Sequence, residues 1–406
     1  MKYYFVITPF FPTQDKFYGS YIYDQVSALR RQGKSIIILR PYSGFSLQED
    51  YEYNGFKVYY FRCIDMPSYI LNGLTDSLNR ILFISFFRRV FDINIDIEVV
   101  HCHTSQCALY GNIIKELFPQ CTSVIQYHDL DPFTILNGKF ADKKWNLIFK
   151  IRKTVKKVEK FDVHVSVSKR VEENLLYFPY PSPREEYTPY LERLSSLTSL
   201  SIPPLKAKKT IILINGVDKN LFYIDKHLVK ESDRFIIGCI GNYIELKRHR
   251  CLVDAIKILI ERGVTDIRLK LVGNNPPEFF KELKQYVLLC GIEKYVEYCP
   301  PYNHDQLRDF YNSINLFVLP SVFEGLGCVF LESWACGTPF ISCRNQGIDD
   351  LVLPEEKDLW LISKDNSLEL ADKIWMFKEK RYKQHLVDSI DIDIQIKRFL
   401  ENLSLC

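Results

Sequence analysis

The sequence predicts an α/β protein made of two doubly wound domains in tandem. Apolar stretches of strand length alternate with stretches of helical period in both halves of the chain. Most of these strands are apolar at every position, which is typical of parallel sheets covered on both faces. The 406 residues are enough for two independent hydrophobic cores.

The N-terminal half begins with a strand, a helix and a second strand. The helix is expected over 21–33, where Gly33 ends it. Since a strand–helix–strand order with fully apolar strands favours parallel pairing, these elements predict the first sheet. The strands predicted in this half are 3–8, 35–39, 98–101, 123–127 and 163–167.

The C-terminal half repeats the alternation after an irregular excursion at about 178–208, which is rich in Pro, Ser and charge. A strand and turn at 210–218 restore regular structure. We therefore expect an N-terminal domain over 1–217, a C-terminal domain over 218–380 and a helical tail over 381–406. The second series comprises strands 235–241, 267–273, 295–298, 315–320 and 340–343 and helices near 249–261, 304–312 and 328–336.

The net charge, the cysteine pattern and the lengths of the apolar runs indicate which partners and which cell compartment to expect. The net charge of +3 is too small to predict nucleic acid as a main partner. The 12 cysteines include no CxxC pair, which indicates thiols in a reducing compartment. Neither a signal peptide nor an apolar run of membrane-spanning length is expected, so the predicted location is cytoplasmic.

Polar or glycine residues follow nearly every predicted strand. Ligands of doubly wound sheets bind at the carboxyl ends of the strands, near the point where the strand order reverses. A large ligand is therefore expected in a cleft between the two domains. The residues at these ends are Thr8, His101, His103, His128 with Asp129, and Ser168 in the first half, and Gly241, Gly273 and the loop of Glu324 in the second.

Phosphate recognition is predicted without a standard nucleotide motif. No G-x-G-x-x-G follows the first strand and the chain has no P-loop, which disfavours NAD enzymes and P-loop NTPases. Gly19 precedes one helix, and Gly325 and Gly327 precede another, where backbone amides can face an anion. Lys247 adds a positive charge after the strand at 235–241.

Two glutamates flank the second of these helix starts. Glu332 lies among apolar residues, where a carboxylate is costly unless something hydrogen-bonds it. A ribose diol would supply two hydroxyl donors, whereas the structural alternative is a salt bridge. Glu324 lies in a glycine-rich loop from which it could reach a sugar, although it could also be simply exposed.

The motifs in this order resemble those of retaining glycosyltransferases of the GT-B fold, in particular family GT4, whose E-x7-E motif matches Glu324 and Glu332. The resemblance extends from about residue 5 to 352, and its domain-junction motif matches "INGVD". The matching stretches are "PFFPTQDKFYGS" (9–20), "EVVHCH" (98–103), "YHD" (127–129), "INGVD" (214–218), "GNYIELK" (241–247) and "EGLGCVFLE" (324–332).

The resemblance implies a GT-B fold, two Rossmann-like domains facing across a cleft, and a nucleotide-sugar donor. Glu332 would bind the ribose, Lys247 would neutralise the diphosphate, and His128 would contact the sugar from the opposite domain. Glu324 would hold the transferred sugar with the backbone of the next three residues. The full set of implied donor contacts is Gly19, Asn242, Lys247, Arg248, Gly273, Glu324, Gly325, Leu326, Gly327 and Glu332.

The chain departs from the family pattern at several positions. Asn242 stands where the family usually has an Arg, so one phosphate charge is missing, and Arg248 or Arg250 is a possible replacement. Arg248 itself replaces a glycine, and Ser20 replaces the second glycine of the first loop. Because the central residues remain, we expect an active enzyme.

The implied reaction transfers a sugar with retention, without a bound metal or other cofactor. A UDP-sugar is the expected donor, with a GDP-sugar as the alternative. The expected acceptor is a glycan or a polyprenyl-linked oligosaccharide in surface polysaccharide assembly. No obvious carboxylate nucleophile is present, so front-face attack by the acceptor is the mechanism that the family suggests.

Three alternatives stay open. Asp129 and Asp131 in "HDLD" could form the metal site of a GT-A transferase, or the chain could be a non-catalytic carbohydrate-binding subunit. The cluster "HCHTSQC" (101–107), with His101, Cys102, His103 and Cys107, could hold a metal, but its spacing matches no standard zinc pattern.

The stretch 143–160 is strongly basic and carries apolar residues at helical spacing. A basic amphipathic helix can rest on an anionic membrane surface, but it can equally be a domain helix with a solvated basic face. A membrane-borne acceptor would suit the first interpretation and would place the protein at the inner face of the cell membrane.

Overall fold

The computed structural model describes residues 1–14, 18–44, 46–138, 140, 142–185, 202–228, 233–273 and 277–404. The chain divides into two compact units. The first unit contains Met1–Asn215 and Ile392–Cys406, and the second contains Gly216–Asp391. The C-terminal segment thus belongs to the first unit, whereas the sequence suggested a separate tail. The central part of the predicted excursion, 186–201, lies outside the described residues.

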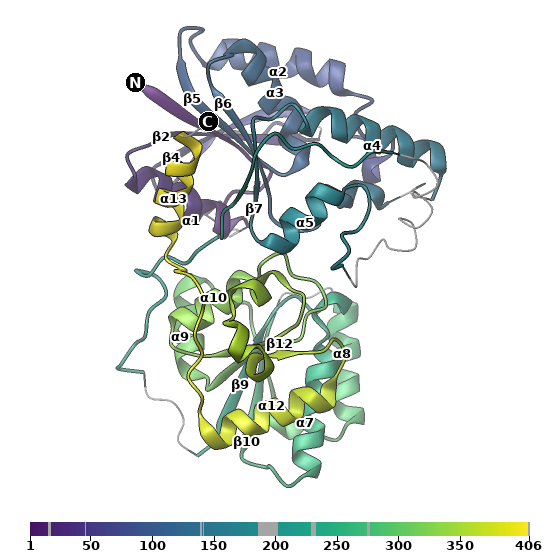
Figure 1. Ribbon diagram of the computed structural model, residues 1–406, viewed down its shortest axis with the longest axis vertical. Coiled ribbons are helices and arrows are strands. Elements are labelled where there is room, and N and C mark those ends of the chain that lie inside the picture. The colour runs from purple at the N-terminus through teal and green to yellow at the C-terminus, as the bar shows by residue number, and fades with distance from the viewer. Residues whose placement is uncertain are drawn as a thin grey trace. The chain divides into compact units, whose positions relative to one another are not determined.

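The first unit contains an eight-stranded sheet of order β3-β4-β2-β1-β5-β6-β7-β8 (Figure 1). All neighbouring strands pair in parallel except β3 and β4. Sequential strands lie on both sides of β1, as the doubly wound prediction requires. The strands are β1 (Lys2–Ile7), β2 (Ser35–Ser43), β3 (Tyr51–Tyr53), β4 (Phe56–Cys63), β5 (Asp96–His103), β6 (Thr122–Tyr127), β7 (Val163–Ser166) and β8 (Thr210–Ile212).

Helices cover both faces of this sheet (Figure 1). On one face lie α1 (Ser20–Arg31) and α13 (Ile392–Ser404), whose Val26, Leu29 and Phe399 share one buried cluster with the strands. This packing explains why the last helix belongs to the first unit. On the other face lie α2 (Asp76–Val90), α3 (Ala108–Leu117) and α4 (Lys144–Val158), while α5 (Lys169–Tyr177) packs beside β7.

The antiparallel edge is a hairpin that the sequence analysis did not predict. β3 and β4 pair around Asn54 and Gly55, both of which have positive φ angles of 46° and 76°. Asn-Gly between two short apolar and aromatic runs is a strong hairpin signal, because both residues adopt this conformation readily. The signal was therefore present in the sequence.

The second unit contains a six-stranded, fully parallel sheet of order β11-β10-β9-β12-β13-β14. Its strands are β9 (Phe235–Ile240), β10 (Ile267–Val272), β11 (Val296–Cys299), β12 (Leu316–Leu319), β13 (Phe340–Cys343) and β14 (Leu361–Ile362). Its helices are α7 (His249–Glu261), α8 (Pro277–Leu289), α9 (His304–Ser313), α10 (Cys328–Ala335), α11 (Lys357–Trp360) and α12 (Ser367–Lys380). The predicted strands and helices of this half are confirmed.

From the sequence we expected a helical tail over 381–406 and no apolar run long enough to span a membrane. The tail predicted as helical is helical only from Ile392 onward, because Tyr382–Asp391 runs without a helix. Among the helices described, none combines the length and the hydrophobicity that a membrane span would need.

Candidate functional site

The strand orders determine where a site can form in each unit. In the first sheet the chain winds outward in both directions from β1 and β5, and in the second sheet from β9 and β12. The carboxyl ends of such central strands are where doubly wound sheets bind ligands. His103 ends β5, and the loops after β9 and β12 carry Lys247 and Glu324. The site residues predicted from sequence therefore lie at these reversal points.

Lys247 and Glu324 form an ion pair in the second unit. The Lys247 Nζ lies 2.5 Å from Glu324 Oε1, and the two side chains are 21% and 11% exposed. Lys247 ends a short turn, Glu245–Lys247, that follows β9, whereas Glu324 lies between β12 and α10. From the sequence we expected a separate role for each residue, and their contact with each other was not predicted.

Gln346 holds the Glu324 loop in place. Its Oε1 accepts a hydrogen bond of 2.7 Å from the Glu324 backbone N–H, and its Nε2 donates to the Val322 carbonyl at 3.2 Å. The Gly347 N–H also donates to the Glu324 carbonyl at 3.2 Å. Gln346 is 1% exposed, so these bonds are protected from water. Sequence reasoning missed this residue because no local motif marks it.

Gly327 sets the start of α10. It has a φ of 80°, and a Cβ at this position would lie 2.6 Å from the Phe330 ring. The first turn of a helix has backbone N–H groups without helical partners, which favours an anion there. A Cβ at Gly347 would lie 1.9 Å from the Gly325 carbonyl, so the glycine-rich loop also packs tightly on its other side.

Glu332 projects from the middle of α10 and accepts a hydrogen bond of 2.8 Å from the Tyr311 hydroxyl on α9. Burial raises the pKa of Glu332 to about 7, and the Tyr311 bond lowers it only in part. Among the described residues, the side-chain partner of Glu332 is thus a hydroxyl group and not the cation of the salt-bridge alternative considered from sequence. A carboxylate with one hydrogen-bonding partner retains capacity for further donors, such as vicinal hydroxyl groups.

The ends of β9 and β10 approach each other through glycines. A Cβ at Gly273 would lie 2.3 Å from the Gly241 carbonyl, so no larger residue fits there without displacing backbone. A Cβ at Gly241 would lie 3.5 Å from the Lys247 side chain. Gly241 and Gly273 therefore bring two strand ends close to the lysine, and the side chain of Asn242 is exposed beside them.

Arg248 and Arg250, considered as replacement charges, are both engaged in ion pairs. The Arg248 Nε lies 2.9 Å from Asp365 and its Nη1 lies 3.1 Å from Glu245, while Arg250 lies 3.4 Å from Glu282. Arg248 has a φ of 51°, a conformation that glycine adopts most easily. The backbone thus keeps the shape expected of the glycine that the family has at this position.

Three histidines form a stack at the carboxyl end of the first sheet. The rings of His101 and His103 have centroids 4.6 Å apart, and those of His103 and His128 have centroids 5.1 Å apart. The His103 Nδ1 lies 2.8 Å from the His128 Nε2, and the Tyr4 hydroxyl lies 2.8 Å from the His101 Nδ1. The candidate residue His128, which follows β6, is therefore oriented by His103 at the end of the neighbouring strand β5.

Burial keeps these histidines neutral. It lowers the pKa values of His101 and His128 to about 3, and it also lowers that of His103 well below its ordinary value. A neutral imidazole carries one N–H, so the bond between His103 and His128 couples the tautomers of the two rings. Within the described ranges, no three His, Cys, Asp or Glu side chains are arranged to share a metal ion.

The remaining candidates of the first unit have structural partners. Gly19 directly precedes α1 and has a φ of 81°, and a Cβ there would lie 2.8 Å from the Phe10 carbonyl. Asp131, one half of the "HDLD" pair, is buried and accepts bonds from the Ser105 backbone N–H at 2.6 Å and from the Ser105 hydroxyl. Asp131 thus caps the short helical turn after β5, while Asp129 is exposed.

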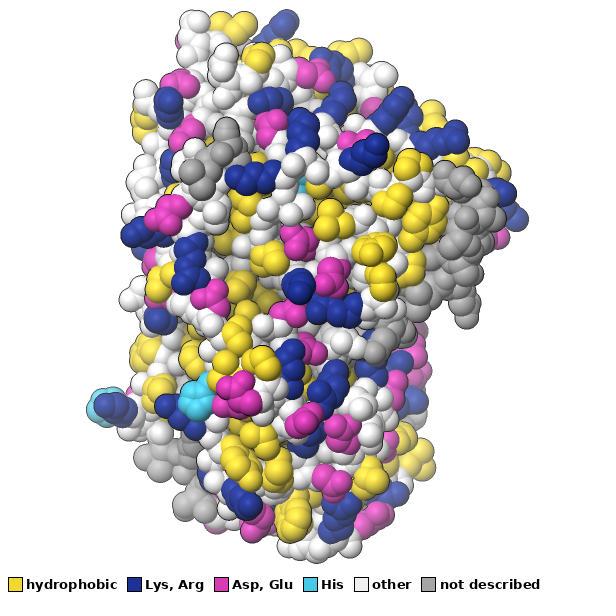
Figure 2. Space-filling model, viewed as in Figure 1, with side chains coloured by type: hydrophobic (Ala, Val, Ile, Leu, Met, Phe, Trp, Pro, Cys, Tyr) yellow, Lys and Arg dark blue, Asp and Glu magenta, His cyan; other side chains and the backbone are white. Residues whose placement is uncertain are grey.

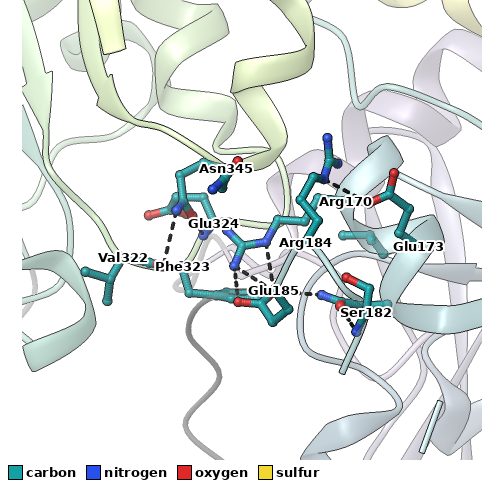
Figure 3. A network of polar contacts seen from close by, with 12 residues as sticks. Arg170, Glu173, Ser182, Arg184, Glu185, Val322, Phe323, Glu324 and Asn345 are labelled. Carbon is teal, nitrogen blue, oxygen red and sulfur yellow. Dashed lines mark hydrogen bonds and ion pairs between the residues drawn. The ribbon is translucent and has the colours of Figure 1, made fainter. Parts of the chain in front are cut away.

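Two ion pairs secure the chain after α5. Arg170 and Glu185 lie 2.6 Å apart with side chains only 3% and 0% exposed (Figure 3). Arg184 pairs with Glu173 at 2.8 Å. These bonds hold the described beginning of the excursion against α5.

Two family models match this chain, and together they cover most of it. Residues 19–185 match the model described as Glycosyltransferase Family 4, and residues 234–377 match the model described as Glycosyl transferases group 1. The chain belongs to the GT4 glycosyltransferases. Its two parallel-sheet units have the GT-B fold, which sets aside the GT-A alternative.

Curated relatives of this GT4 chain match over part of their length. The capsular polysaccharide biosynthesis glycosyltransferase CapM of Staphylococcus aureus is 27% identical over 166 residues, which is 39% of this chain and 42% of CapM. The putative glycosyltransferase EpsF of Bacillus subtilis is 31% identical over 152 residues, which is 34% of this chain and 36% of EpsF. The matched region thus spans less than half of either relative.

Solved structures share the fold across the whole chain. HepE of Anabaena, crystallised in complex with UDP and glucose, superposes with a TM-score of 0.67 at 16% sequence identity and covers 100% of both chains. At this identity the likeness concerns the fold.

Proposed function

We propose that this protein is a retaining glycosyltransferase that moves a sugar from a UDP-sugar to a glycan or lipid-linked oligosaccharide in surface polysaccharide biosynthesis. The observation that carries this proposal is the contact between Lys247 and Glu324. This contact lies beside the start of α10, which Gly327 precedes. Support for the donor comes from solved relatives bound to UDP and UDP-glucose. Support for the pathway comes from CapM, whose name specifies capsular polysaccharide biosynthesis.

The leaving diphosphate gains negative charge as the bond to the anomeric carbon breaks. Lys247 and the first-turn amides of α10 supply positive charge and hydrogen-bond donors to that group. Preorganised donors of this kind need little rearrangement during the reaction, which is why they stabilise the transition state. Lys247 exchanges its carboxylate partner for the diphosphate, and Glu324 is then released to accept bonds from the sugar hydroxyls.

Glu332 serves the nucleotide rather than the sugar. It projects from α10, and among the described residues its carboxylate accepts a hydrogen bond from the Tyr311 hydroxyl alone. The ribose diol would add donors to a carboxylate whose pKa is about 7, and these donors favour its charged form. Donor binding should therefore release a proton near neutral pH.

His128 contacts the transferred sugar as a neutral hydrogen-bonding group. A neutral imidazole can orient a hydroxyl without introducing a full charge beside the developing oxocarbenium ion. Among the proposed donor-contact residues, Glu324 and Glu332 are the only carboxylates, and both have assigned binding roles. We therefore propose front-face attack by the acceptor hydroxyl, with the leaving phosphate oxygen taking its proton.

A UDP-release assay with UDP-glucose, UDP-galactose and UDP-N-acetylglucosamine, with and without polyprenyl-linked acceptor, tests the activity. The expected result is release that depends on one donor and rises with acceptor. NMR of the product before anomeric equilibration then shows whether configuration is retained. Donor binding without any transfer or hydrolysis would instead favour the non-catalytic carbohydrate-binding alternative.

The same assay with a chelator tests the expectation that no metal is required. Turnover should stay within about twofold when EDTA is added, because Lys247 and the α10 amides provide the charge that a metal would otherwise supply. Loss of turnover that Mg²⁺ or Mn²⁺ restores would contradict this part of the proposal.

A further inference from the structure

The outward face of α4 in the first unit combines bare positive charge with exposed apolar surface. Trp145 is 56% exposed, and Ile148, Phe149 and Val155 are partly exposed. These four, with Arg152, Lys153 and Lys156, line a groove of about 720 Å³ that Ile202 and Pro203 complete. Figure 2 shows dark blue Lys and Arg side chains next to hydrophobic ones on the upper right of the view.

The inward face of α4 has already satisfied its polar groups. Asn146 accepts a bond of 3.0 Å from the Leu71 N–H and donates at 3.1 Å to the Phe140 carbonyl. Lys157 pairs with Asp76 at 3.3 Å. Leu147 and Ile151 pack in the core. The helix is thus rigidly held, and its outward charges are not needed to hold it.

The outward cations have no carboxylate partner among the described residues. Lys144, Arg152 and Lys156 are exposed and Lys153 is partly exposed. Within the ranges that the structure describes, no ion pair involves any of these four, although Lys153 lies 5.6 Å from the Phe149 ring centre. Within the described part of the chain their charge is therefore uncompensated.

The spacing places both kinds of side chain on one stripe. Ile148 and Phe149 follow Trp145 by three and four residues, Arg152 follows Phe149 by three, and Lys156 follows Arg152 by four, which puts these side chains on one side of the helix. A helix of this length extends about 22 Å. Long basic side chains can keep their charged ends at a polar layer while their stems and the aromatic rings lie in apolar surroundings.

We propose that this face of α4, together with Ile202 and Pro203, docks on an anionic lipid bilayer surface. Uncompensated cations match lipid phosphates, and Trp145 and Phe149 match the boundary between headgroups and acyl chains. A soluble acidic protein is the alternative occupant, and cation-dependent binding to protein-free vesicles distinguishes the bilayer from it. The proposal goes beyond the transfer reaction, and lipid binding is measured without donor or acceptor, so the two can fail separately.

Co-sedimentation with phosphatidylcholine vesicles, with and without phosphatidylglycerol, tests the proposal on the full chain. We expect binding at least about tenfold tighter to the anionic vesicles, weakening steeply between about 0.1 M and 1 M salt. The variant Lys144→Glu/Arg152→Glu/Lys153→Glu/Lys156→Glu should lose this binding. The matched control reverses four exposed lysines of the second unit, Lys281→Glu/Lys294→Glu/Lys380→Glu/Lys383→Glu, and should retain the preference for anionic vesicles.

Quenching of Trp fluorescence by brominated lipid reports where the contact lies. Trp145→Phe should remove most of the quenching, whereas Trp375→Phe, at a residue 50% exposed on the second unit, should leave it. Equal binding by the α4 variant and its control, or quenching that survives Trp145→Phe, would overturn the proposal. So would heparin binding with no vesicle binding, which would identify the face as a general polyanion surface.

Discussion

The Lys247 ammonium and the Glu324 carboxylate contact each other at 2.5 Å across two loops that follow different strands of the second sheet. Their pairing has a physical consequence for ligand binding, because each side chain is the other's oppositely charged partner in a partly buried place. When a diphosphate binds Lys247, Glu324 loses its ion-pair partner and can accept hydrogen bonds from other donors. Sugar hydroxyls can supply these, so the pair links the binding of the two ends of one donor.

Glu324→Gln and Lys247→Ala should therefore have different kinetic effects. We expect Glu324→Gln to lower turnover about 100-fold, because the amide binds sugar hydroxyls less strongly, with nucleotide affinity nearly unchanged. Lys247→Ala should weaken nucleotide affinity about tenfold and lower turnover as well. Steady-state kinetics and UDP titrations separate the two effects. Normal turnover by Glu324→Gln at saturating donor would refute its role.

Gly327→Ala should destabilise the protein and weaken donor binding together. The residue has a φ of 80°, and the added Cβ would meet the Phe330 ring at 2.6 Å. We expect a loss of roughly 2–4 kcal/mol of unfolding free energy, which urea denaturation measures. The control Gly263→Ala shares a positive φ of 88° but has open space around it, so only about 1 kcal/mol should be lost. Equal losses of unfolding free energy in Gly327→Ala and Gly263→Ala would show that the Phe330 ring moves aside at little cost.

The protonation of Glu332 should make stability depend on pH. Burial raises its pKa from 4.5 to about 7, so between these values the folded chain keeps a proton that the unfolded chain has lost. Stability due to this group therefore falls as the pH rises through that window, by roughly 1–3 kcal/mol given its partial solvent access. Relative to the wild type, Glu332→Gln should gain stability from pH 5 to pH 8.

Thermal unfolding of the wild type, Glu332→Gln and the exposed-site control Glu278→Gln measures this effect. The difference in melting temperature between the wild type and Glu332→Gln should change steadily with pH. The corresponding difference for Glu278→Gln should stay flat, because that side chain is exposed. A flat difference for Glu332→Gln would show that the carboxyl titrates as it does in water.

His103 should matter for turnover although it is 1% exposed. Its Nδ1 lies 2.8 Å from His128 Nε2, so it helps to set which nitrogen of His128 carries the proton. We expect His103→Phe to lower turnover about tenfold with a smaller effect on the KM for the donor, and His128→Ala to lower it further. The buried control His164→Phe should keep turnover near normal. A similar loss in both Phe variants would indicate a structural effect only.

Much of the fold could be predicted because its strands are short apolar runs between helices of clear period. The strand at 35–39 and the helix at 249–261 are examples, and the structure has them as parts of β2 and as α7. The position of α13 could not be predicted, since its apolar face does not indicate which of two cores it covers. The β3–β4 hairpin was missed although Asn54-Gly55 is a sequence signal for a hairpin turn.

The candidate site was predictable where one motif carries its residues. Glu324, Gly327 and Glu332 lie within nine consecutive residues, and Lys247 follows a predicted strand. Their partners were not predictable, because Tyr311 and Gln346 belong to other segments and are brought near only by the packing of α9 and the loop after β13. The contact between His103 and His128 was not predictable either, because only the pairing of β5 with β6 brings these two segments together.

Isothermal titration of UDP into the wild type, Lys247→Met and Lys281→Met shows whether Lys247 binds the diphosphate. We predict one site per chain, with UDP affinity at least about tenfold weaker in Lys247→Met and unchanged in Lys281→Met, which alters an exposed lysine on α8. UDP binding of equal strength in all three proteins, or no binding to the wild type, would contradict a diphosphate seat formed by Lys247 and the start of α10.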